Sequence, residues 1–93
     1  RLKMSKIIEI EYCHRCNWLA RVCWYAQEIL QTFTKDINGV RLTPSNVAGV
    51  FTIKLDETLL MDRKVHGFRD AVWVKRTLKK ELGITRKLGH LDP

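Results

Sequence analysis

The hydrophobic pattern of this chain changes period within residues 11–18, which read EYCHRCNW. Before this stretch, Lys6–Tyr12 alternates between two faces, which predicts a β-strand. After it, apolar residues recur every three or four positions, which predicts an amphipathic helix over residues 17–35. The residues expected to face the core are Ile8, Ile10, Tyr12, Leu19, Val22, Cys23, Ala26, Ile29, Leu30 and Phe33. A strand that leads directly into such a helix favours a βαβ unit, whose two strands run parallel.

The rest of the chain predicts three further strands and a second helix. The strand candidates are Val40–Pro44, Val50–Leu55 and Leu59–Arg63, the last two forming a hairpin. The second helix is expected over Arg69–Leu82, with Gly83 as its C-cap. The segments between them are the turn 36–39 and the loops 45–49, 56–58 and 64–68. The order β-α-β-β-β-α predicts a thioredoxin-like α/β fold, with a four-stranded mixed sheet in the order 2-1-3-4.

Length and composition indicate one globular domain. The chain has 93 residues, of which 45% are hydrophobic, so we expect a single domain over residues 6–93 and a frayed N-terminus over residues 1–5. No apolar run approaches the roughly 20 residues that a membrane helix needs. No segment reads as a signal peptide, so a cytoplasmic location is expected, where thiols are kept reduced.

The C-x-x-C pair, Cys13 and Cys16, is the strongest candidate for chemistry. It is expected at the carboxyl end of a central strand and at the start of a helix, where open α/β sheets usually carry their sites. The helix N-terminus, together with His14 and Arg15, would lower a thiol pKa from about 8.5 into the range of roughly 3.5 to 7.5. One thiolate could then attack a disulfide and the other thiol could resolve the product. We therefore predict a redox-active pair, with Cys13 and Cys16 as catalytic residues.

Two other interpretations of the pair are weaker. A zinc site needs two more ligands, but the chain has no second C-x-x-C, and His66 and His90 are isolated. Cys23 falls on the apolar stripe of the first helix and is expected to be a small core residue. No metal or other cofactor is therefore predicted. Two buried structural cysteines are disfavoured because polar residues separate them.

Two neighbours of the pair are candidate modulating residues besides Arg15. His14 could shuttle protons near neutral pH, or it could simply be exposed. Trp18 lies about one helical turn from the pair and could wall the site or contact a partner, although packing is the expected role of the tryptophans in general.

The positive charge of the chain suggests a second class of function, that of a binding module. The formal net charge is +7, and four cations share a face of the second predicted helix: Lys75, Arg76, Lys79 and Lys80. Such a patch could meet an acidic protein or nucleic acid, but a solvated helix face is the favoured interpretation. No interleaved aromatic residues or known motif accompany the patch, which disfavours nucleic acid.

The segment IEYCHRCNWLARVCWYAQEILQTF resembles the start of selenoprotein W-like proteins, a group that includes selenoproteins T and H. The similarity continues through RLTPSNVAGVFTIKLDETLLMDRK and HGF to the tail LGHLDP, which is similar to bacterial, cysteine-containing members. It covers residues 6–93. The resemblance implies a thioredoxin-like fold and a thiol–disulfide oxidoreductase role in cell redox homeostasis or antioxidant defence. Glutathione or a thioredoxin-type protein could be the electron donor, or the donor could be a different molecule.

The resemblance also bears on the roles within the site. Selenocysteine in some relatives aligns with Cys16, which favours Cys16 as the attacking group. In thioredoxins the first cysteine of the motif is the exposed attacking residue, which favours Cys13. We prefer Cys16 as the attacking group and expect both cysteines to be redox-active. Relatives often have Gly-Gly-Phe-Pro where this chain has residues 66–69, HGFR, so substrate choice is not carried over. Pro44 is a candidate for the cis-proline that thioredoxin-like proteins often place beside the pair. The alternative function is a redox sensor or binding module, whose partner contact depends on the thiol or disulfide state.

Overall fold

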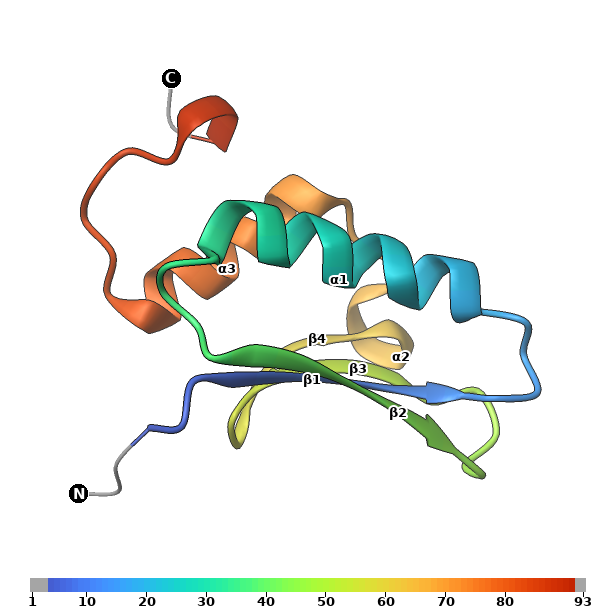
Figure 1. Ribbon diagram of the computed structural model, residues 1–93. Helices are drawn as coiled ribbons and strands as arrows, with labels where there is room; N and C mark the ends of the chain where they lie inside the picture. Colours follow the sequence, from blue (N-terminus) through green and yellow to red (C-terminus); the bar gives the residue numbers. More distant parts are fainter. Residues whose placement is uncertain (1–3, 92–93) are drawn as a thin grey trace.

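The computed structural model describes residues 4–91, except for the side chain of His90, and shows a two-layer α/β fold (Figure 1). The elements are β1 (Ile7–Cys13), α1 (Leu19–Phe33), β2 (Gly39–Ser45), β3 (Phe51–Leu55), β4 (Thr58–Asp62), α2 (Arg63–His66), α3 (Ala71–Leu82) and the 3₁₀ turn η1 (Gly89–Leu91). α1 and α3 lie on one face of the sheet (Figure 1). The fold prediction is confirmed, and each strand boundary differs from its predicted position by at most one residue.

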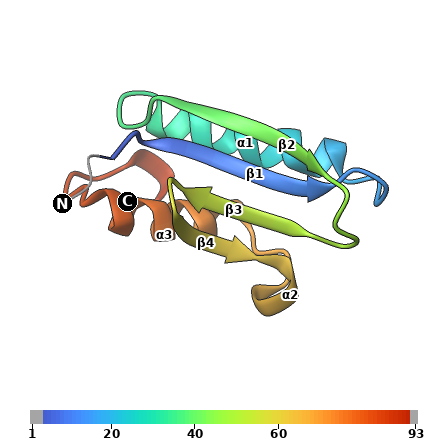
Figure 2. The ribbon, with the colours of Figure 1, turned by 90° about the horizontal axis from the view of Figure 1, so that it is seen from below.

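The sheet has the predicted strand order, β2-β1-β3-β4, which can be followed in Figure 2. β1 is central: it pairs parallel with β2, placing Ile10 beside Leu42, and antiparallel with β3, placing Ile10 beside Ile53. β3 and β4 form the expected antiparallel hairpin. Because β1 is hydrogen-bonded on both sides, its carboxyl end is held in a fixed position.

The core lies between the sheet and the two long helices. The strands contribute alternate residues, as the period-two pattern requires. The fully buried strand residues are Ile8, Ile10, Phe51, Ile53, Leu55 and Met61, and they meet Val22, Tyr25, Ile29, Phe33, Val74, Leu78 and Leu91. Leu91 belongs to the tail, for which the sequence showed no period, so the end of the chain also packs on the core.

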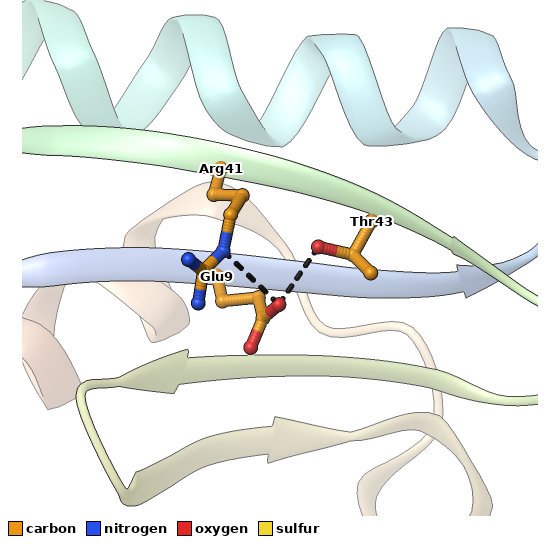
Figure 3. A network of polar contacts seen from close by, with 3 residues as sticks. All are labelled: Glu9, Arg41 and Thr43. Carbon is orange, nitrogen blue, oxygen red and sulfur yellow. Dashed lines mark hydrogen bonds and ion pairs between the residues drawn. The ribbon is translucent and has the colours of Figure 1, made fainter.

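The face of the sheet away from α1 and α3 is polar where β1 meets β2. The Glu9 carboxylate accepts a hydrogen bond from Thr43 Oγ1 at 2.7 Å and from Arg41 Nε at 3.2 Å (Figure 3). The Thr43 hydrogen bond is the main cause that lowers the pKa of Glu9, and Arg41 adds to it. These contacts join the parallel strands across the solvent side.

The apolar face of α1 is rotated relative to the prediction. Its buried residues are Val22, Tyr25, Ala26, Ile29 and Phe33, so Tyr25 belongs to the core face. Cys23 is exposed, and Leu19 and Leu30 are 56% and 42% exposed. The prediction that Cys23 is a core residue was wrong, because the sheet contacts the side of the helix on which Tyr25 lies.

One further expectation needs correction, and the candidate cis-proline can be decided. Residues 63–66, expected as part of a strand end and a loop, form the short helix α2, in which the Asp62 carboxylate caps the backbone N–H of Lys64 at 2.9 Å. The Thr43–Pro44 peptide is not cis, since the described residues contain no cis peptide bond. Gly83 is the C-cap of α3, as predicted, with a left-handed φ of 70°.

The expected basic face of α3 is divided. Lys75 is only 2% exposed and donates to the Glu28 carboxylate on α1 at 2.8 Å. Arg76 and Lys80 are exposed. The buried cation therefore joins the two helices and is not available to a partner, which corrects the four-residue patch.

The expected fraying of residues 1–5 falls partly outside the described residues, since residues 1–3 are not among them. Met4 packs against the core. The Ser5 carbonyl accepts a hydrogen bond from Asn38 Nδ2 at 2.8 Å. The two described residues of this segment thus make contacts with the domain.

Replacing Ile10 by alanine tests the position of the core. Ile10 is fully buried between β2 and β3, so Ile10→Ala should lower the free energy of unfolding by about 2–5 kcal/mol. Its neighbour Leu42 is 38% exposed, and Leu42→Ala should cost about 1 kcal/mol or less. Urea unfolding measures both. Equal costs would contradict this placement of the core.

Candidate active site

The two cysteines lie at the two ends of one tight turn. Cys13 is the last residue of β1 and is 2% exposed, whereas Cys16 is half-buried. The Cys16 N–H donates to the Cys13 carbonyl at 3.4 Å. Such a turn brings its end Cα atoms within about 7 Å, close to the roughly 4.4–6.8 Å that a disulfide spans. Both are free thiols, as is Cys23.

The turn precedes the helix, which corrects one part of the sequence argument. α1 begins at Leu19, three residues after Cys16, and Asn17 between them has a left-handed φ of 58°. The effect of a helix terminus falls off within its first turn. Stabilisation of a thiolate here comes from other groups.

Hydrogen bonds lower the pKa of Cys13. The largest cause is the bond that it accepts from the Cys16 thiol, followed by the backbone N–H of Gly49. The backbone N–H and the charge of Arg15 lower the pKa further, while burial opposes them. These contacts favour the thiolate form of Cys13.

The same hydrogen bond shifts the pKa of its donor, Cys16, in the opposite direction. The pKa of Cys16 is raised, first because its thiol proton is given to Cys13, and then by burial and by the charge on Cys13. The Gly49 N–H and the charge of Arg63 partly oppose this shift. The two shifts therefore separate the pKa values of the pair, so that the buried thiol is the more acidic and the half-exposed thiol the less acidic.

Gly49, in the β2–β3 loop, directs its N–H toward both sulfurs. The loop is held against the strand end because the Cys13 N–H donates to the Val50 carbonyl at 2.8 Å. Gly49 has a φ of 73°, and a Cβ there would lie 3.1 Å from Arg63 Nη2. The backbone conformation therefore favours glycine at this position, and a larger residue would also make Arg63 shift by a few tenths of an ångström.

Arg63 binds the carbonyl group of Gly49. Its Nε and Nη2 donate to the Gly49 carbonyl at 3.1 and 2.7 Å, and its guanidinium lies 5.0 Å from the centre of the Trp18 ring. Arg63 was predicted only as the end of a strand, and no local signal in the sequence marked it. Its importance follows from α2 lying at the same end of the sheet as the thiol turn (Figure 2).

The predicted modulating residues lie around the same loop. His14 Nε2 lies 2.9 Å from Asn46 Oδ1, and Arg15 Nη2 donates to the Asn46 carbonyl at 3.2 Å. Both side chains are exposed. Arg15 acts on Cys13 as described above, whereas His14 contacts the loop.

Trp18 is half-buried and forms part of an aromatic cluster. Its ring makes edge-on contacts with Phe51 and Phe68, with centroids 5.7 and 5.3 Å apart. Phe68 belongs to the HGF segment, which the Tyr25 hydroxyl anchors by donating to the Arg69 carbonyl. Trp18 therefore connects the thiol turn to the core and to the segment before α3.

No described group of three or more His, Cys, Asp or Glu side chains is placed to hold a metal ion. Of the candidates raised by the sequence, His66 is engaged elsewhere, since its Nδ1 accepts the Asp62 N–H at 2.9 Å. Within residues 4–91, no helix has the length and hydropathy needed to cross a bilayer.

Comparison with known proteins identifies the family. A model of the Rdx family matches residues 7–81. The chain belongs to the Rdx family. The match includes the thiol turn, the Gly49 loop and Arg63, and the family is generally redox-related. No curated protein matches the chain significantly.

Two solved bacterial structures share the fold of this Rdx-family chain. A selenoprotein W-related protein from Vibrio cholerae is 36% identical, with a TM-score of 0.78, over 82% of this chain and 95% of that one. A protein from Bordetella parapertussis is 41% identical, with a TM-score of 0.77, over 81% of this chain and 95% of that one. The resemblance to selenoprotein W-like proteins is thus confirmed.

Replacing Arg63 tests its role in the site. Arg63→Met removes the charge and both bonds to the Gly49 carbonyl, so we expect the thiolate to form at higher pH. The measurement is the thiolate absorbance and the alkylation rate with iodoacetamide, each as a function of pH. Arg21→Met is the matched control, because Arg21 also covers an aromatic ring, that of Phe68, at 4.1 Å. An unchanged profile for Arg63→Met, or an equal shift in both variants, would contradict this role.

Proposed function

We propose that this protein is a thiol–disulfide oxidoreductase that uses Cys13 and Cys16. The observation that carries the proposal is the placement of two free thiols at the ends of one tight turn, with Cys13 buried and Cys16 half-exposed. Their contact lowers the pKa of Cys13 and raises that of Cys16. Thiolates are the nucleophiles of disulfide exchange, and access decides which sulfur can be reached. The arrangement gives one sulfur the role of base and the other the role of attacking group.

The first step is attack by Cys16. Its thiol proton passes to Cys13 as its sulfur bonds to one sulfur of a substrate disulfide, whose S–S bond breaks and releases the first substrate thiolate. That thiolate then takes the proton from Cys13. The regenerated Cys13 thiolate attacks Cys16 in the mixed disulfide and releases the second substrate thiolate. The substrate gains two electrons, and the protein is left with a Cys13–Cys16 disulfide.

A second pair of electrons must restore the dithiol. A low-molecular-weight thiol such as glutathione, or a thioredoxin-type dithiol protein, can supply them by the reverse exchange. Such a cycle needs a compartment that keeps thiols reduced, and the cytoplasm is the proposed one. The role that fits is maintenance of cellular thiols or antioxidant defence.

A redox sensor is the alternative that one observation favours. The Gly49 N–H bonds to both sulfurs, so a disulfide between them would change the hydrogen bonding of the β2–β3 loop. That loop carries Val47, which is 56% exposed. Oxidation would then alter a surface that a protein partner can contact. Disulfide formation with peroxide, without turnover of any disulfide substrate, would favour the sensor.

Single-cysteine variants test which sulfur attacks. Cys23 is exposed, so the tests use a Cys23→Ser background. With an aromatic disulfide as the probe, Cys13→Ser should accumulate a mixed disulfide through Cys16, because nothing remains to resolve it. Cys16→Ser should form little adduct, because Cys13 is buried. Intact mass, with peptide mapping, identifies the adducts.

The parent dithiol protein and the variant without either cysteine serve as controls. The parent dithiol should release two coloured thiols and retain no adduct, and the variant without either cysteine should not react. A stable adduct through Cys13 in Cys16→Ser would reverse the assigned roles. No exchange by the parent protein would reject the oxidoreductase function.

A further inference from the structure

Three segments that carry exposed apolar side chains lie at the end of the sheet where the thiol turn is found. Val65 on α2, Val47 in the β2–β3 loop and Leu19 at the start of α1 are 73%, 56% and 56% exposed. They come from three separate segments, each of which contains or adjoins a residue of the site. Figure 2 shows those segments at the same end of the sheet. We call Leu19, Val47 and Val65 the apolar rim; exposed hydrophobic residues grouped in this way are typical of interaction surfaces.

A basic hollow lies beyond the aromatic cluster. It has a volume of about 690 Å³ and is lined by Phe68, Arg69, Asp70, Val72, Trp73, Arg76, Thr77 and Lys80. Three cations line it against one carboxylate, and that carboxylate accepts the Trp73 N–H at 2.8 Å as the cap of α3. The hollow therefore presents net positive charge beside apolar surface.

The hollow and the thiol turn are connected through one side chain. Phe68 lines the hollow and also packs on Trp18, two residues from Cys16. More cations stand along this path: Arg21 covers the Phe68 ring, and Arg15 and Lys64 are exposed beside the turn. Cations thus lie both beside the thiol turn and in the hollow, and the contact between Trp18 and Phe68 connects the two places.

We propose that this surface docks an acidic polypeptide that carries the disulfide substrate, an inference that rests on the proposed function. The apolar rim receives an apolar residue next to the substrate cysteine, and the basic hollow receives carboxylates farther along the same chain. A polypeptide fits because the rim and the hollow are separate and a linear chain can contact both. Opposite charge steers the encounter and raises its rate in a salt-dependent manner.

Three synthetic peptides test the proposal. Each has one cysteine in a disulfide with a coloured aromatic thiol and a leucine beside that cysteine, and they differ only in acidic, neutral or basic flanks. The rate of colour release by the reduced protein, in the Cys23→Ser background, should be about tenfold higher for the acidic than for the basic peptide at low salt. High salt should remove most of that difference.

Charge-matched variants locate the effect. The double variant Arg76→Glu and Lys80→Glu should lose the preference for the acidic peptide. The control, Lys35→Glu and Lys87→Glu, makes the same change in net charge at a different hollow and should keep it. Val65→Ser should slow all three leucine-containing peptides several-fold and leave a small aliphatic disulfide unaffected.

The results distinguish a failure of the docking proposal from a failure of the proposed function. Equal rates for the three peptides, or equal losses in the two charge variants, would overturn the acidic-polypeptide proposal while leaving disulfide exchange intact. Absence of reaction with every peptide and with the small disulfide would overturn the proposed function, and the docking proposal with it. A higher rate with the acidic peptide, which is lost in the Arg76 and Lys80 variant and kept in the Lys35 and Lys87 variant, supports both.

Discussion

The hydrogen bond between the two thiols, Cys13 and Cys16, separates their pKa values, since it lowers that of Cys13 and raises that of Cys16. Sulfur is a weak hydrogen-bonding atom, so such a bond has an effect only where the acceptor sulfur is shielded from water and has further donors. Cys13 meets both conditions, since it is 2% exposed and also receives the backbone N–H groups of Gly49 and Arg15. The chemistry proposed for this protein depends on that arrangement.

The rest of the fold holds the bond in place. β1 is paired on both sides, which fixes Cys13, and the tight turn after it fixes Cys16. Gly49 comes from the β2–β3 loop, and its carbonyl group accepts hydrogen bonds from Arg63 of α2. Segments widely separated in the sequence thus converge on two sulfurs, which is why the site needs the complete sheet and not only the C-x-x-C motif.

Much of the fold followed from periodicity. The alternation of Ile8 and Ile10 and the stepped pattern of α1 were sufficient to place the central strand and the helix, and the order of the six predicted elements then gave the strand order. What periodicity could not give is the rotation of a helix about its axis, because Tyr25 and Cys23 both border the apolar stripe and only the sheet decides which is buried. α2 was missed because a single capped turn is too short to show a period.

The thiol pair could be singled out from the sequence, but its supporting residues could not. Cys13 and Cys16 stood out by spacing, and Arg15 by adjacency. Gly49 and Arg63 did not, because their roles arise from contacts between distant segments: a glycine in a loop and an arginine after a strand are common in any sequence. The cause expected for a lowered pKa, a helix N-terminus, was replaced by backbone N–H groups, since the left-handed Asn17 and the residue after it separate the turn from α1.

The measurement that tests this account most directly is the reduction potential of the Cys13–Cys16 pair. Purified protein with Cys23→Ser is equilibrated against glutathione buffers of graded potential, and free thiols are counted by intact mass. The account predicts a reversible two-electron couple with a midpoint between about −300 and −120 mV, the range of working thiol–disulfide exchangers. Failure to form the intramolecular disulfide at any potential would contradict it.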